Sequence, residues 1–143
     1  MPTPATAVVL RLIREVVNHN DLSPIDELVH PDFYSHAAPP TRANGPTGVA
    51  ATVRELHRTI AAFRIDPSDV ITAGDKIVVR ATASGRNLHP GTPRECEWSA
   101  EQIHIFRIVD GQIIEHWVAG EHQQLCGAAP ARRRATPPSR RFQ

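Results

Sequence analysis

The sequence predicts an α+β fold in which helices pack against a strongly curved antiparallel sheet, and three observations support this. Apolar residues recur with the period of a helix over residues 5–18 and again over 47–63. The second half of the chain contains successive runs with the composition and alternation of strands. Asp110-Gly111, between two of these runs, is a strong hairpin signal. Helices followed by strands favour α+β over alternating α/β, and 143 residues suit a single domain.

The helical half contains two amphipathic helices, at 5–18 and 47–63, and a short helix between them. The short helix is expected over 24–29, because Ser23 can act as its N-cap and Pro24 suits the first helical position. The apolar faces are formed by Val9, Leu12, Ile13, Val16 and Val17 in the first helix, and by Val49, Val53, Leu56, Ile60 and Phe63 in the last.

The strands follow from composition and turn residues. A short strand is expected over 32–36, followed by a loop rich in proline and glycine, whose length suggests a lid or a pocket rim. A strand over 64–72 is interrupted by Pro67, and a turn at Gly74-Asp75 leads into a strand over 77–84. The hairpin completes a meander of four strands.

A two-residue turn at Asp110-Gly111 fixes the hairpin register, so that Phe106 faces Glu115 and His104 faces Trp117. Because faces alternate along a strand, one face then carries a polar patch made of Gln102, His104, Trp117 and Glu121. The other face carries Ile103, Ile105, Val118 and His116, which we expect to be mostly packing. A β-bulge within 94–101 would change the facing of Trp98 and Glu97.

Composition excludes several classes of protein. Hydrophobic residues make up 41% of the chain and charged residues 22%, and no apolar run reaches the roughly 20 residues of a membrane span. The N-terminus does not resemble a signal peptide. Cys96 and Cys126 lack metal-like spacing, so we expect free thiols and a cytoplasmic location. Histidine pairs with metal-binding spacing and glycine-rich cofactor loops are absent, so neither a metal nor a cofactor is expected.

The net charge of +1 hides an uneven distribution. Residues 129–143 hold five of the 16 Lys and Arg residues and no acid, and they are rich in proline. We expect a mildly acidic folded domain over 1–128 and a disordered tail over 129–143. Binding to nucleic acid is not expected from a bare charge run of this kind, and neither is binding to a membrane.

Four segments carry a resemblance to a known family. They are D-L-x-x-I-x-E-L-V-x-P-D-F at 21–33, G-P-x-G at 45–48, A-G-D-K-I-V-V-R at 73–80 and H-I-F-R-I-V-D-G-Q-I-I-E-H-W at 104–117. Together they resemble the SnoaL-like polyketide cyclases, which have the nuclear-transport-factor-2-like fold, a cone of helices against a curved sheet. The resemblance extends over nearly all of residues 5–127. The fold also hosts isomerases, epoxide hydrolases and non-enzymes, so it does not by itself define an activity.

The resemblance implies a cyclase that works by acid–base catalysis without a cofactor, closing a ring by intramolecular aldol condensation. In the family, a carboxylate four residues after the tryptophan of the E-H-W segment is the general base, and here this is Glu121, where aspartate is usual. The family's polar pair on the preceding strand corresponds to Gln102 and His104. His104 would donate to the ketone oxygen while Gln102 orients the substrate. A second histidine, two residues before the base in many members, is Ala119 here.

A small polycarbonyl or polycyclic molecule is the expected substrate. Its other expected contacts are Trp117, His36, Tyr34, Trp98 and His116. Each site residue also has a structural interpretation: Glu121 can be a surface residue, His104 a core histidine, and Trp117 packing in the pocket wall. The apolar outer face of the sheet is typical of assembly into a homodimer or homotetramer.

Two other functions stay open at this stage. One is a different lyase, isomerase or hydrolase of the same fold, such as an epoxide hydrolase, although the patch offers few acids for that chemistry. The other is a non-catalytic ligand-binding accessory protein, which the loss of polarity at Ala119 favours.

Overall fold

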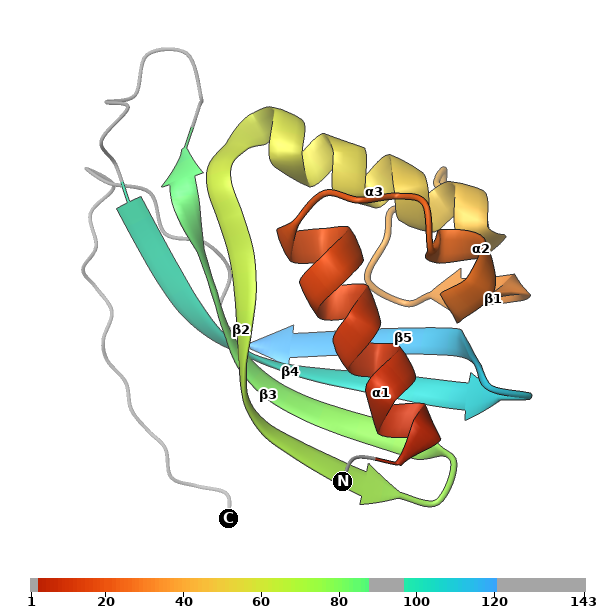
Figure 1. The fold of residues 1–143 in the computed structure, drawn as a ribbon. Helices are drawn as coiled ribbons and strands as arrows, with labels where there is room; N and C mark the ends of the chain where they lie inside the picture. The colour runs from red at the N-terminus through yellow and green to blue at the C-terminus, as the bar shows by residue number, and fades with distance from the viewer. Residues whose placement is uncertain (1–2, 88–96, 121–143) are drawn as a thin grey trace.

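The computed structural model describes residues 3–87 and 97–120, and Figure 1 shows the arrangement of the elements. In chain order they are α1 (Pro4–Arg11), the π-helical η1 (Leu12–Asn18), α2 (Ile25–Leu28), β1 (Val29–Ser35), α3 (Gly45–Thr59), β2 (Ile60–Ala73), β3 (Lys76–Asn87), β4 (Glu97–Val109) and β5 (Gln112–Gly120). The predicted tail at 129–143, Cys96 and Cys126 lie outside the described residues.

The five strands form one curved sheet in the order β1-β5-β4-β3-β2. Strands β2 to β5 are an antiparallel meander, as the sequence predicts, and β1 joins the edge beside β5 in parallel. In Figure 1, α1 crosses one face of the sheet and α3 leads directly into the far end of β2. The predicted α+β fold class, helices packed on a strongly curved open sheet, is confirmed.

The first predicted helix, 5–18, is present as α1 followed without a break by η1. The Asn18 side chain fastens its end to β2, because Nδ2 donates to the carbonyl of Ile65 at 2.9 Å and Oδ1 accepts from the Ile65 amide at 2.7 Å. His57 of α3 lies 2.6 Å from the carbonyl oxygen of Val17. These bonds hold η1 between the sheet and α3, and satisfy polar groups that would otherwise be left unpaired in the interior.

Two helix boundaries differ from prediction. Ser23 does not cap α2: its hydroxyl and its amide both bond the Asp21 carboxylate, so an Asx-type turn precedes the helix instead. Helix α3 ends at Thr59 rather than at 63, and Ile60 and Phe63 belong to β2. Ile60 and Phe63 keep the inward facing that the helical pattern indicated, since both line the cavity described below.

The hydrophobic core lies between the helices and the inner face of the sheet. Its most deeply buried side chains come from every layer and are each less than 2% exposed: Val9, Val16, Leu28, Val29, Ile77, Val79 and Ile113. Pairing across the sheet aligns Val79 with His104 and Ile77 with Phe106, so the polar residues of β4 extend the same inner face.

The hairpin register is where the sequence-based prediction is wrong. Asp110 and Gly111 adopt φ of 53° and 77°, as the predicted turn requires, and Ile108 pairs with Ile113. The register then shifts: Arg107 pairs with Glu115, so β5 carries one extra residue. Such a bulge moves every later residue of β5 to the opposite face.

The corrected pairs are Phe106 with His116, His104 with Val118, and Gln102 with Gly120, in place of Glu115, Trp117 and Ala119. His116 and Val118 therefore face inward beside His104. Trp117 shares the outer face with Ile103 and Ile105, so Val118 no longer belongs to that face.

Candidate functional site

A cavity of about 710 Å³ lies between the inner face of the sheet, the η1 and α3 helices and the segment 33–44. This volume is within the range of small-molecule sites, roughly 300–1,000 Å³. Most of its wall is apolar, with aliphatic side chains from the helices and aromatic ones from the strands. They include Leu12, Ile13, Phe33, Val49, Val53, Leu56, Phe63, Ile65 and Phe106. The predicted pocket rim is confirmed, because residues 34–40 and 42–44 line the cavity.

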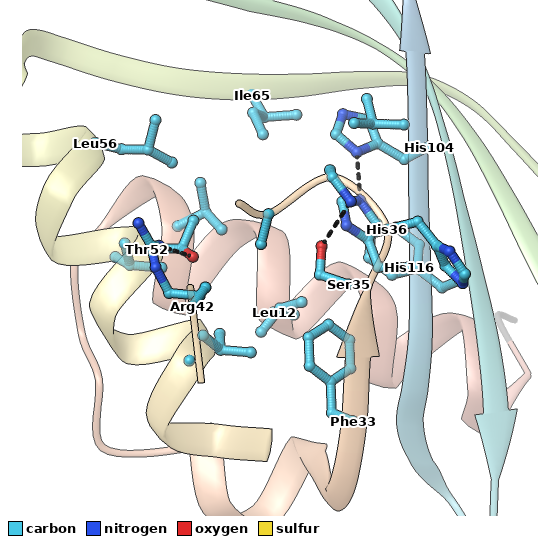
Figure 2. Close-up of a pocket in the computed structure, with 18 of the residues that line it drawn as sticks. Leu12, Phe33, Ser35, His36, Arg42, Thr52, Leu56, Ile65, His104 and His116 are labelled. Carbon is cyan, nitrogen blue, oxygen red and sulfur yellow. Dashed lines mark hydrogen bonds between the residues drawn. The ribbon is translucent and has the colours of Figure 1, made fainter. Parts of the chain in front are cut away.

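A chain of three hydrogen-bonded side chains lies on the sheet side of this cavity. His104 Nε2 is 2.9 Å from Gln102 Oε1, and His104 Nδ1 is 2.9 Å from His116 Nε2 (Figure 2 shows the two imidazoles in contact). An amide oxygen only accepts, so His104 Nε2 carries a proton and its Nδ1 accepts from His116 Nε2. Both nitrogens of His104 are thus engaged. Among the described residues, the groups of this chain of side chains that form no other hydrogen bond are the Gln102 amide N–H and His116 Nδ1.

Burial keeps both imidazoles of this chain neutral. His104 is only 6% exposed, and desolvation lowers its pKa to about 4. Burial also lowers the pKa of His116, to about 3, with smaller contributions from His104 and His36. A neutral imidazole pair polarises or orients a carbonyl without adding a charge to the cavity.

His36 lines the cavity and also contacts Glu115 and Trp117 on the outer face of the hairpin. Its Nε2 lies 2.8 Å from Glu115 Oε2, and Glu115 Oε1 accepts from Arg107 Nε at 2.8 Å. These two partners lower the pKa of the Glu115 carboxyl, first His36 and then Arg107. The His36 ring also stacks on Trp117, with centroids 4.7 Å apart and planes 7° apart. Trp117 therefore supports the rim from outside the cavity, which corrects its predicted place in the pocket wall.

Arg42 lies across the cavity from the histidines, against α3 (Figure 2). Its backbone amide donates to Pro39 O at 2.9 Å, closing a turn, and its Nη1 donates to Thr52 Oγ1 at 2.5 Å. Arg42 and Thr52 are site residues that the sequence patterns did not predict. The signals were present: Arg42 is the one charged residue in the predicted rim between 37 and 46, and Thr52 interrupts an apolar helix face.

The structure brings together most of the predicted site residues. The cavity is lined by Tyr34, His36, Trp98, Gln102, His104 and His116. The indole N–H of Trp98 is buried and has no hydrogen-bond partner among the described residues. Glu121, the predicted base, lies outside the described residues. Because Gly120, and not Ala119, pairs with Gln102, the hairpin register no longer predicts that Glu121 shares the face of Gln102, and its role stays a prediction from the family resemblance.

Comparison with known proteins decides the family. The family of SnoaL-like polyketide cyclases matches residues 7–126, most of the chain. The chain belongs to that family. No protein of curated function matches it. Members of this family bind small-molecule polyketide substrates. None of the described helices is long and apolar enough to cross a membrane.

Solved structures share the fold of this chain. TsrD from Streptomyces laurentii is 29% identical, with a TM-score of 0.68 over 80% of this chain and 89% of that one. IdmH from Streptomyces antibioticus is 22% identical, with a TM-score of 0.70 over 82% and 91%. A SnoaL-like polyketide cyclase from Agrobacterium tumefaciens is 12% identical, with a TM-score of 0.68 over 85% and 93%. The last two likenesses establish the fold alone.

Proposed function

We propose that the protein is a cofactor-independent cyclase that closes a ring in a polycarbonyl intermediate by intramolecular aldol condensation. The observation that supports this most directly is the Gln102–His104–His116 chain at one side of an otherwise apolar cavity. An apolar cavity folds a flexible polycarbonyl chain into an attack geometry, and the polar groups define where its reacting oxygen lies. The assignment to SnoaL-like polyketide cyclases is consistent with such a substrate.

In the proposed reaction Glu121 removes a proton from the carbon α to a carbonyl. The resulting enolate carbon attacks a ketone of the same molecule, a C–C bond forms, and the new alkoxide takes back the proton from the Glu121 carboxyl. The Gln102 amide N–H donates to the ketone oxygen as its charge develops. His104 then acts through Gln102, by holding the amide oxygen, instead of donating to the ketone itself.

The decisive experiment is Glu121→Gln, which keeps the shape of the side chain and removes the base. We expect ring closure of a polycarbonyl substrate to slow by about 10²–10⁴-fold, the usual contribution of positioned acid–base catalysis. Affinity for the cyclised product should stay unchanged. The matched control is Glu101→Gln, because Glu101 is an exposed carboxylate that bonds Arg80. A Glu121→Gln variant with wild-type turnover would eliminate Glu121 as the base.

A ligand-binding accessory protein is the second candidate, and one observation favours it. The cavity lining formed by residues 12–118, within the described part of the chain, contains no aspartate or glutamate. A binder of this kind would bind the polycyclic product equally well before and after Glu121→Gln and would accelerate no ring closure. The same experiment therefore separates the two functions.

Assembly into a homodimer or homotetramer through the outer sheet face stays a prediction. The row across that face consists of Val78, Ile105 and Trp117, because the bulge in β5 places Trp117 opposite Ile105, where the predicted register places His116. Sedimentation equilibrium of the wild-type chain and of Ile105→Glu would measure whether this row is the contact.

A further inference from the structure

Arg42 is partly buried in the cavity wall, and it has no carboxylate partner among the described residues. Five described arginines form ion pairs within 4 Å: Arg11, Arg58, Arg64, Arg80 and Arg107. The described arginines that form none are otherwise exposed: Arg14, Arg54 and Arg86. Arg42 is thus the described arginine that lines the apolar cavity and has no carboxylate partner among residues 3–87 and 97–120.

The position of the guanidinium is determined by the protein. The turn closed by the bond from the Arg42 amide to Pro39 O sets its backbone, and Thr52 Oγ1 accepts from Nη1. A guanidinium has five N–H donors, and this bond to Thr52 uses one of them. The remaining donors suit a carboxylate, which accepts two parallel hydrogen bonds from a guanidinium.

The cavity therefore has two polar ends separated by apolar walls. Figure 2 shows Arg42 and Thr52 on the α3 side, and His104 and His116 on the sheet side, with Leu12, Leu56 and Ile65 among the side chains around them. An uncompensated cation at a partly desolvated position favours a ligand anion more strongly than one in bulk water.

We propose that Arg42, held by Thr52, binds a carboxylate at one end of the substrate while the Gln102–His104–His116 chain engages a carbonyl at the other. The substrate class is then a free polycyclic or polycarbonyl acid, and Arg42 is a specificity-determining residue. This inference rests on the proposed function for the identity of the cavity as the substrate site. It does not depend on which residue is the base.

The test measures binding of two fluorescent probes of equal shape, 2-anthracenecarboxylate and 2-anthracenecarboxamide, at pH 7.5. The wild-type protein should bind the carboxylate about tenfold more tightly than the amide, which corresponds to ~1.4 kcal/mol. Arg42→Met removes the charge but keeps an unbranched stem, and it should abolish this preference while amide binding persists. The matched control is Arg54→Met, at an exposed arginine of α3 that does not line the cavity, and it should retain the tenfold preference.

A second variant guards against an effect of Arg42→Met on folding. Thr52→Val removes the hydroxyl that accepts from Arg42 and should reduce the preference about threefold. Equal binding of both probes to the wild-type protein, or an unchanged preference in Arg42→Met, would overturn the inference and leave the cyclase proposal standing. If neither probe bound the wild-type protein, the inference about Arg42 would fail, and ring closure of a polycarbonyl substrate would still decide the cyclase proposal. Slow ring closure in Glu121→Gln bears on the cyclase proposal alone.

Discussion

Acidification should destabilise this protein well above the pH at which carboxylates are protonated, because His104 is buried and neutral. Its pKa is about 4 in the folded protein, against roughly 6.5 in an unfolded chain. Between these two values the unfolded state binds a proton that the folded state excludes. The free energy of unfolding should therefore fall by ~1.4 kcal/mol for each pH unit below about 6.5. The loss from His104 is complete near pH 4 and absent above pH 7.

The loss from pH 6.5 to pH 5 amounts to about 2 kcal/mol from His104 alone, a large part of a typical stability of 5–15 kcal/mol. His116, whose pKa is also lowered by burial, acts in the same direction. Three carboxyls also have a lowered pKa in the folded protein: Asp21, Asp66 and Glu115. The stability that they contribute is lost only when they are protonated, which happens at a lower pH than this window. The range from pH 6.5 to pH 5 thus isolates the histidines.

The assay is urea unfolding followed by tryptophan fluorescence at pH 7, 6 and 5, for the wild-type protein and for His104→Gln. The glutamine variant should lose stability less steeply between pH 6 and 5, by ~1.4 kcal/mol per pH unit. The control, His19→Gln, removes an exposed imidazole and should leave the slope as in the wild-type protein. Identical slopes for His104→Gln and the wild-type protein would show that burial of His104 does not control the acid response.

Two further substitutions test the packing that shapes the cavity. Leu28 is 1% exposed, and Leu28→Ala should lower the free energy of unfolding in urea by about 2–5 kcal/mol. Ile71 is 58% exposed, and Ile71→Ala should change it by less than about 0.5 kcal/mol. Equal losses in the two variants would contradict the assignment of the core. A Cβ on Gly48 would collide with the carbonyl oxygen of Ala43, so Gly48→Ala should displace the rim, cost about 1–3 kcal/mol and weaken binding of 2-anthracenecarboxylate. If Gly48→Ala kept wild-type stability and affinity, the contact between Gly48 and Ala43 would not determine the position of the rim.

Local patterns predicted most of the elements because the physics behind them is local. Helical periodicity identified 5–18 and the bulk of α3, and the need for positive φ at Asp110 and Gly111 identified the hairpin turn. The end of α3 was misplaced because Ile60 and Phe63 both face inward three residues apart, as they would in a helix, and the register shift in β2 between Ala61 and Arg64 is what allows this in a strand. Tertiary contact between β2 and β3, where Ile60 pairs with Asn87, selected the strand.

The candidate site was predicted only in part, for a related reason. Gln102 and His104 lie on the inner face as expected, since β4 alternates without interruption along its pairing with β3. His116 and Trp117 exchanged faces because one extra residue enters β5 between Ile113 and Glu115. A strand repeats every two residues, so a single insertion inverts all that follows.

The sequence by itself therefore determines the order of helices and strands, the turn at 110–111 and the family. Each of these depends on residues a few positions apart or on motifs that are visible in the sequence. Only the tertiary structure determines which residues contact one another across distant segments. Examples are the hydrogen bond between His104 and His116, the stacking of Trp117 on His36 and the hydrogen bond from Arg42 to Thr52. Those contacts are selected by the packing of the whole core, which no local pattern contains.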